Sequence, residues 1–300
     1  MKIRPYDREK DFSAIYDFLV DIYQPGDVLY NWLAPRWEYA HFHPFIWELD
    51  LTRFGIAEKD GQIVGIVHFE DNHAQVILEV RPGYEHLRLE LLNYAEEMDY
   101  RGMSRSRNKP IRVVYVYDFD TEFEQDVASR GYEKWPEFGE AHSLYRLDKE
   151  VPTPTLPEGY HLQSLEDEND FSKINKVLWR GFNHPGEPPE EEIEGRKFGQ
   201  QAPHFRKDLT IVAIAPNGDY ASYCGMYYVP ENKVAMLEPL ATDPDYRRMG
   251  MASAVVRESM RRVQALGAEV CWVGADLPIY RALGFEVKFT IYPWAKLFDD

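Results

Sequence analysis

The chain has 300 residues, a formal net charge of −17 and 44% hydrophobic residues. This length and composition predict one large or two ordinary globular domains. The acidic excess argues against general nucleic-acid binding, which requires a basic face. Because no apolar run reaches the length of about 18 residues needed to span a bilayer, we also expect no membrane partner.

We expect neither export nor metal binding from this sequence. The first residues lack the apolar core of a signal peptide, and Cys224 and Cys271 are the two cysteines. We therefore expect a cytoplasmic protein with two buried, reduced thiols. His41 and His43 have no third ligand in sight and no Cys/His cluster has zinc spacing, so we expect no metal site.

The sequence contains the same plan twice. Three short segments recur in the same order at a nearly constant offset: 9–15 with 168–174, 80–84 with 242–246, and 131–133 with 284–286. This common order indicates an internal duplication. Between the copies lies a proline-rich segment without apolar periodicity, typical of a linker or an extended crossover. We predict a first domain at 1–148, a linker at 149–158 and a second domain at 159–300.

The second copy gives the clearer element pattern. An edge strand is expected at Tyr160–Leu165, then a helix through Phe171 and Leu178 capped by Asp167 or Asn169. A short acidic helix follows. Three further segments read as strands, with a hairpin turn after the first: 209–215, 220–229 and the run that bears Glu238. A long helix should end at Gly267 before a buried strand at 269–273. This succession predicts a mixed α/β sheet.

The stretch Tyr246–Ala252 is expected to bind an anion. It follows an apolar strand and opens the long helix. A helix start offers unpaired backbone N–H groups and a positive dipole end, and glycine lets the backbone approach a phosphate. Two cations, Arg247 and Arg248, stand at this start, where they are unfavourable unless an anion joins them.

The same stretch resembles a family signature. The pattern Arg-x-x-Gly-x-Ala at Arg247, Gly250 and Ala252 resembles the acyl-CoA signature of the GNAT superfamily of N-acetyltransferases. Downstream, Tyr280 and the pair Gly284-Phe285 resemble the family's Tyr-x-x-x-Gly-Phe segment. The resemblance covers roughly residues 159–292. Many members carry an Asn after the preceding strand, whereas residues 273–276 here read Val-Gly-Ala-Asp, so no role of such an Asn is carried over.

The resemblance implies tandem GNAT-like acyl-CoA N-acyltransferase domains of mixed α/β fold, with acetyl-CoA (coenzyme A) as cofactor. Tyr280 would protonate the coenzyme A thiolate, because an ordinary phenol is protonated at neutral pH. Backbone groups of the last strand residues would pair with the pantetheine arm, and the following turn would hold the pyrophosphate. These cofactor-binding residues are Leu240, Ala241, Thr242, Arg247, Arg248, Met249, Gly250, Met251 and Ala252.

Glu238 is the candidate general base, acting directly or through a water. It is a lone carboxylate in an apolar strand beside the expected reaction centre, where burial would raise its pKa. An outward-facing residue, or one paired to an arginine, is the alternative interpretation of the same pattern. The first copy differs at these positions: Glu85 replaces Arg247, Arg88 replaces Gly250 and Val127 replaces Tyr280. We therefore predict that the first domain is degenerate and serves packing and the shape of the substrate cleft.

Together these features predict an acetyl-CoA-dependent N-acetyltransferase that transfers directly to a primary amine of a small molecule or peptide. A non-catalytic acyl-CoA-binding or regulatory protein and a transferase for another acyl-CoA stay open as alternatives. One segment, rich in aromatic and acidic residues, would suit a cationic amine as the acceptor. A solvated acidic helix with core aromatics explains the same composition. The segment contains Trp179, Phe182, His184, Phe198, His204, Phe205, Glu187 and Glu190–Glu194. A monomer and a homodimer are both compatible with the sequence.

Overall fold

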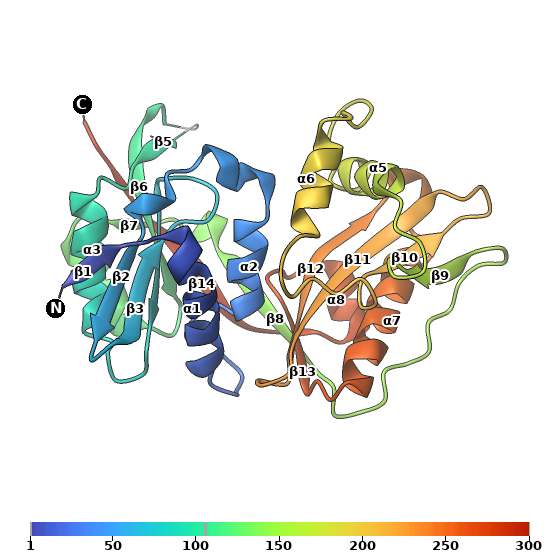
Figure 1. Cartoon of the computed structure of the whole chain (residues 1–300), viewed down its shortest axis with the longest axis horizontal. Coiled ribbons are helices and arrows are strands. Elements are labelled where there is room, and N and C mark those ends of the chain that lie inside the picture. Colours follow the sequence, from blue (N-terminus) through green and yellow to red (C-terminus); the bar gives the residue numbers. More distant parts are fainter. Residues whose placement is uncertain (1, 105–106, 300) are drawn as a thin grey trace. The chain divides into compact units, whose positions relative to one another are not determined.

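The computed structural model describes residues 2–104 and 107–299 (Figure 1). The chain forms two compact units. Unit 1 consists of Met1–His41, Phe45–His142 and Lys288–Asp300, and unit 2 consists of Phe42–Pro44 and Ser143–Val287. None of the helices in these described ranges is long and apolar enough to cross a membrane.

Unit 1 is a sheet with helices packed on it. Its helices are α1 (Arg8–Asp21), α2 (Ala34–His41), α3 (Leu87–Glu97) and α4 (Thr121–Ser129), with 3₁₀ turns at Leu51–Arg53 and Pro136–Phe138. Its strands are β1 (Ile3–Pro5), β2 (Gly55–Lys59), β3 (Gln62–His68), β4 (Gln75–Val80), β5 (Gly102–Ser104), β6 (Lys109–Tyr117), β7 (Glu133–Lys134) and most of β14 (Glu286–Leu297). The strand order is β1-β2-β3-β4-β6-β14, and β4 and β6 are parallel.

Unit 2 repeats this plan. Its helices are α5 (Phe171–Gly181), α6 (Glu192–Gly199), α7 (Met251–Ala265) and α8 (Pro278–Leu283), with a 3₁₀ turn η4 at Pro244–Tyr246. Its strands are β9 (His161–Ser164), β10 (Ile211–Ile214), β11 (Tyr220–Val229), β12 (Val234–Thr242), β13 (Val270–Val273) and the second half of β8 (Glu140–Arg146). The order β9-β10-β11-β12-β13-β8 matches that of unit 1, and β12 and β13 are the parallel pair.

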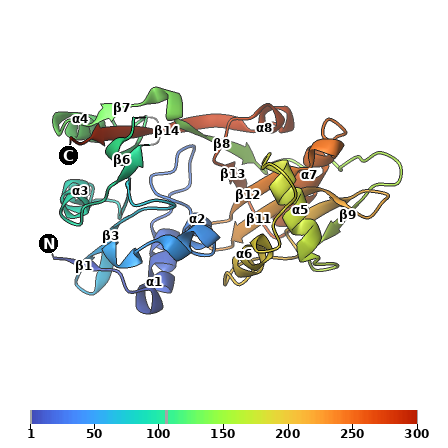
Figure 2. The same ribbon diagram turned by 90° about the horizontal axis from the view of Figure 1, so that it is seen from above.

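The last strand of each sheet comes from the other copy of the sequence. β8 follows the elements of the first copy, yet Ser143–Arg146 pairs with β13. β14 follows α8 of the second copy, yet Ile291–Leu297 pairs with β6, and Figure 2 shows it running beside β6 and β7. The expected bounds 1–148, 149–158 and 159–300 divide the chain at one place, whereas the compact units exchange these strands. Those bounds stay a prediction about the duplication. Residues 1, 105, 106 and 300 lie outside the described residues.

The segment expected as a linker is anchored on unit 2. Residues 149–158 contain no helix or strand. The Gln264 amide of α7 donates to the backbone carbonyls of Leu147 and Lys149 and accepts from the Val151 N–H. The Val151 side chain is fully buried in the core under α7. The segment therefore has the irregular backbone predicted for it, but its first residues are part of a packed unit.

Alternating strand residues build the two cores of unit 2. Ile211 and Ala213 of β10 pack with α7, whereas Val212 and Ile214 pack with α5. Because successive side chains of a strand point to opposite faces, α5 and α7 cover opposite faces of the sheet (Figure 1). Cys224 and Cys271 are buried and free, as predicted. The N-cap of α5 is Asp170, not Asp167 or Asn169, because the Asp167 carboxylate accepts from Ser164 instead.

Candidate active site

The two parallel strands of unit 2 share only a short register. β12 pairs with β13 over Val234–Met236, whereas its antiparallel register with β11 continues to Thr242. The backbone of Leu237–Thr242 on the β13 side therefore lies beyond the pairing with β13. An extended ligand with amide groups can pair with such an edge as an added strand does. This segment contains Glu238 and the three predicted pantetheine-binding residues.

A bulge in β11 accompanies the irregular part of β12. The register shifts between Cys224 and Met226, and the Glu238–Pro239 peptide bond is cis. A Cβ atom on Gly225 would lie 2.2 Å from the Glu238 carbonyl oxygen, so only glycine allows this approach. The pairing of β11 with β12 is therefore irregular beside Pro239, and Glu238 lies where β12 leaves β13.

The turn after β12 presents backbone N–H groups at a helix start. Arg248 and Gly250 both have positive φ, 62° and 87°, and α7 begins at Met251. Gly250 is the N-cap and provides no side-chain cap, and nothing lies within 4 Å of the position that a Cβ atom would take there. The first N–H groups of α7 lack intrahelical acceptors, so the turn has the geometry of an anion site. A phosphate fits here because glycine leaves the approach open.

The two arginines of this turn have different surroundings. The Arg247 guanidinium donates to three protein oxygens: Thr242 O at 3.1 Å, Gly181 O at 2.8 Å and Asn183 Oδ1 at 2.9 Å. Within the part of the chain that the structure describes, Arg248 has no recorded hydrogen bond or ion pair. Arg247 thus ties the turn to the end of α5, and Arg248 is the arginine whose side chain is available to an anion.

A partly buried ion pair, which the sequence did not reveal, positions the turn. Asp243 is 2% exposed and accepts from Arg180 at 2.6 and 3.1 Å. Its Oδ1 atom also accepts from the backbone N–H of Asp245 and so caps η4. Next to Arg180, Gly181 approaches β12 closely, since a Cβ atom there would lie 2.8 Å from the Ala241 Cβ atom. These contacts fix the end of α5 against the end of β12.

Tyr280 and Glu238 lie within electrostatic reach of each other. Tyr280 is on α8, 5% exposed, and packs in the core under α7 with its ring edge-to-face on Phe285. Burial, with smaller contributions from the Cys224 thiol and the Glu238 carboxylate, raises the pKa of Tyr280 well above that of an ordinary phenol. Its hydroxyl therefore stays protonated across the physiological range. Glu238 is half-buried on β12.

The residues expected to line an acceptor site fall into separate groups. Trp179 stacks on His184 with ring centroids 4.5 Å apart and donates its indole N–H to the carbonyls of Pro185 and Gly186. Phe198 on α6 packs against Phe42. Phe205 packs in the core with α5. The remaining members are exposed or half-exposed: Phe182, His204, Glu187 and Glu190–Glu194.

No group of three or more metal-ligating side chains occurs among residues 2–104 and 107–299. His41 is buried in unit 1, where its Nδ1 atom lies 2.9 Å from Trp37 O and its Nε2 atom 3.2 Å from the Tyr6 hydroxyl. Burial lowers the pKa of His41 to about 3, so its ring is neutral at neutral pH. It is a core histidine with both ring nitrogens in hydrogen bonds.

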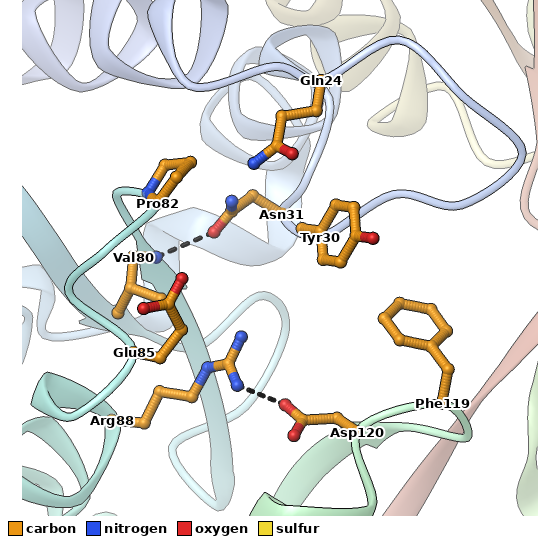
Figure 3. A pocket seen from close by; sticks show the side chains of 9 residues that line it. All are labelled: Gln24, Tyr30, Asn31, Val80, Pro82, Glu85, Arg88, Phe119 and Asp120. Carbon is orange, nitrogen blue, oxygen red and sulfur yellow. Dashed lines mark hydrogen bonds and ion pairs between the residues drawn. The ribbon is translucent and has the colours of Figure 1, made fainter.

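The corresponding region of unit 1 has the same strand geometry and different chemistry. The parallel register of β4 with β6 covers Gln75 and Val76, and β4 then continues alone with β3 to Val80. Here a side chain of unit 1 occupies the strand edge, because the Val80 N–H donates to Asn31 Oδ1 at 2.8 Å. Arg88, at the position of Gly250, forms an ion pair with Asp120. A cavity of about 370 Å³ lies among these side chains (Figure 3).

Part of the chain matches a known family, and the fold of the whole chain is similar to that of solved structures. Residues 171–285 match the model of the acetyltransferase (GNAT) family. Among solved structures, a GCN5-related N-acetyltransferase from Sphaerobacter thermophilus is 18% identical over 99% of this chain and 95% of its own, with a TM-score of 0.64. A tandem GNAT protein from the clavulanic acid biosynthesis pathway is 13% identical over 100% and 99%, with a TM-score of 0.67. No curated protein matches the chain. The tandem fold predicted from the sequence is thereby confirmed.

Proposed function

We propose that this chain, whose residues 171–285 match the model of the acetyltransferase (GNAT) family, transfers an acetyl group from acetyl-CoA to a primary amine. One observation carries the proposal. The open helix start at Gly250 follows the strand segment Leu237–Thr242 that lies beyond the pairing with β13, and Tyr280 and Glu238 lie near that segment. An anion site, a strand edge and two proton-transfer groups are what a thioester-dependent transferase needs.

The cofactor would bind through the backbone. N–H groups of the turn, including those of Met249, Gly250 and Met251, would hold the pyrophosphate, and Arg248 would add a positive charge. Ala252 lies in the first turn of α7, and its N–H extends the same group of donors. Leu240, Ala241 and Thr242 would pair with the amides of the pantetheine arm. Arg247 would act indirectly in this arrangement, because its guanidinium already braces the turn through Thr242 and Gly181.

Acetyl-CoA supplies an activated acetyl group as a thioester. Glu238, directly or through a water, would accept a proton from the attacking amine, so that the nitrogen lone pair can form the C–N bond. As the C–S bond breaks, the Tyr280 hydroxyl would donate its proton to the sulfur. The raised pKa of Tyr280 keeps this proton available at neutral and moderately alkaline pH. A backbone N–H near Thr242 would polarise the thioester carbonyl.

The acceptor is proposed to be a small-molecule or peptide amine that is cationic when free. The exposed carboxylates before and within α6 and the stacked Trp179–His184 pair support this class, because both favour an ammonium group. We further propose that the protein acts in the cytoplasm, as a monomer or homodimer, and that the first copy carries no second active site. A non-catalytic acyl-CoA-binding role and a preference for another acyl-CoA are the competing proposals.

A calorimetric titration of the full chain with acetyl-CoA tests the proposal first, followed by an amine screen with thiol detection. We expect one acetyl-CoA site per chain and amine-dependent release of coenzyme A. Two sites would contradict the assignment of the first copy as degenerate. Binding without release for any amine would favour the non-catalytic role, and tighter binding of a longer acyl-CoA would favour a different donor.

A further inference from the structure

The cavity in unit 1 has a lining that no part of the proposed transferase reaction uses. It lies at the carboxyl ends of β4 and β6, where the second copy has its anion site, and it measures about 370 Å³. Pockets of this size hold small organic ligands. Figure 3 shows side chains from separate segments of unit 1 around it. They are Gln24, Tyr30, Asn31, Val80, Pro82, Glu85, Arg88, Phe119 and Asp120.

Glu85 brings an unbalanced negative charge to this cavity. Its Oε1 atom accepts from the Gly83 N–H at 2.9 Å, and this hydrogen bond, with the nearby Arg88 charge, lowers the pKa of the carboxyl. Glu85 is therefore ionised at neutral pH. Arg88 and Asp120 compensate each other through their ion pair, which leaves the Glu85 charge for a ligand cation.

Asn31 and Arg88 bring hydrogen-bond donors to the same cavity. Asn31 is 7% exposed, and because its Oδ1 atom accepts from the Val80 N–H, its amide nitrogen is directed away from β4. Across residues 2–104 and 107–299 no acceptor is recorded for this nitrogen. Arg88 uses Nη1 for Asp120, and its other guanidinium nitrogens have no recorded acceptor in the same ranges. A buried amide donor beside a guanidinium suits a carboxylate, which accepts several hydrogen bonds.

Two aromatic rings form the third side of the cavity. Tyr30 and Phe119 meet edge-to-face with ring centroids 5.5 Å apart, and they are 44% and 36% exposed. Large aromatic side chains in a folded protein are usually more buried, so this pair offers apolar area to a ligand. Both rings line the cavity together with the charged side chains (Figure 3).

We propose that this cavity binds a small zwitterion of the amino-acid type that carries an apolar or aromatic side chain. Glu85 holds the ammonium group, Asn31 and Arg88 hold the carboxylate, and Tyr30 and Phe119 cover the side chain. In this proposal the second copy has a site for a polyanionic cofactor, and the first copy has a site of mixed charge at the corresponding place. This proposal does not depend on the acetyl transfer proposed for unit 2.

Three related probes test the charge assignment on the full chain: phenylalanine, phenethylamine, which lacks the carboxylate, and 3-phenylpropionate, which lacks the ammonium group. Binding is measured by isothermal titration calorimetry without acetyl-CoA. We expect phenylalanine to bind at least about tenfold more tightly than either analogue, because each loses a charge-assisted contact. Equal or tighter binding of 3-phenylpropionate, or no saturation by phenylalanine or leucine, would overturn the proposal.

A matched pair of variants places the site. Glu85→Gln should weaken phenylalanine and phenethylamine by about tenfold and leave 3-phenylpropionate unchanged. Glu97→Gln makes the same change at an exposed position near the other end of α3 and should leave all three probes unchanged. If phenylalanine binds Glu85→Gln as tightly as the original chain, or if acetyl-CoA competes with it for the Glu85-dependent site, the assignment is wrong.

Discussion

The turn after β12 and the turn after β4 share a backbone plan and differ in what they leave open. In both copies a parallel strand pair separates after a few residues and a helix follows. At the first turn of that helix, Gly250 leaves space where Arg88 fills it with an ion pair to Asp120. The strand edge is also different, because the Asn31 side chain accepts a hydrogen bond from the Val80 N–H. Duplication has thus preserved the opening of the sheet, whereas side chains determine which ligand each opening can take.

In each copy an ion pair joins the end of a helix to the residue that follows one of these strands. In unit 2, Arg180 near the end of α5 pairs with Asp243, which follows β12. In unit 1, Asp21 at the end of α1 pairs with Arg81, which follows β4, so the polarity is reversed. Both pairs join corresponding elements, the end of a helix and the residue that follows a strand. An ion pair between the end of this helix and the residue after the strand is therefore present in both copies, with opposite polarity.

The largest expected effect is at Gly250. Gly250→Glu adds a side chain at a φ of 87° and a negative charge beside the proposed phosphate site, so acetyl-CoA affinity should fall at least about 100-fold. Gly83→Glu is the matched control, since Gly83 has a φ of 86° and equally open surroundings in unit 1. Calorimetry on both variants measures the difference. Equal losses would mean that both turns serve the cofactor.

Tyr280→Phe should lower kcat by about 100-fold with little change in the KM for acetyl-CoA, because it removes the proposed proton donor and keeps the packing. Tyr228→Phe, which removes an exposed hydroxyl bonded to Leu266 O, should leave kcat unchanged. Because burial raises the pKa of Tyr280, its titration should cause no alkaline decline of kcat up to about pH 10. An unchanged kcat in Tyr280→Phe would place the general acid elsewhere.

Removing the acidic charge of each ion pair should lower the free energy of unfolding by different amounts. Asp243→Asn leaves Arg180 without its buried partner and should lower the free energy of unfolding by about 2 kcal/mol. Asp21→Asn should cost less than about 1 kcal/mol, because the Asp21 side chain is 64% exposed. Denaturant unfolding of both variants gives the comparison. Similar costs would show that burial of the carboxylate is not what makes the unit 2 pair important.

The smallest effect concerns acid stability, which should differ between the units. Burial lowers the pKa of His41 and His142 in unit 1 to about 3 from 6.5. The unfolded state binds these protons first, so their contribution is complete above pH 6.5 and is lost as the pH falls toward 3. In unit 2, His161, His184 and His204 are exposed.

Between pH 7 and 5.5, amide protection should therefore fall more in unit 1 than in unit 2, as hydrogen exchange can measure. His142→Phe, in a site where the ring stacks on Phe289, should reduce the loss of stability at pH 5.5 by about 1 kcal/mol. The same loss in the variant and the original chain would remove His142 as a cause.

Local pattern predicted the elements that carry the site, because period and turn residues are local signals. The strand Tyr220–Val229 has the predicted bounds, and α7 follows the glycine turn as expected. The role of Arg247 was harder to infer, since its acceptors at Gly181 and Asn183 lie more than sixty residues away in sequence. The Arg180–Asp243 pair could not be predicted for the same reason, because its two residues are also far apart in sequence. The exchange of β8 and β14 escaped prediction because strand periodicity does not specify a partner.

The exchanged strand also affects how the protein can be made. In unit 1, the Thr290 N–H donates to the Asp118 carboxylate across 172 residues of sequence, and β14 covers the edge of β6 next to it. On a ribosome the amino-terminal copy emerges early, yet it has to keep β6 unpaired on that side until the second copy has been translated. Uncovered strand edges recruit other chains. Unit 1 should therefore complete its fold after unit 2 has begun, and a premature stop would leave an aggregation-prone product.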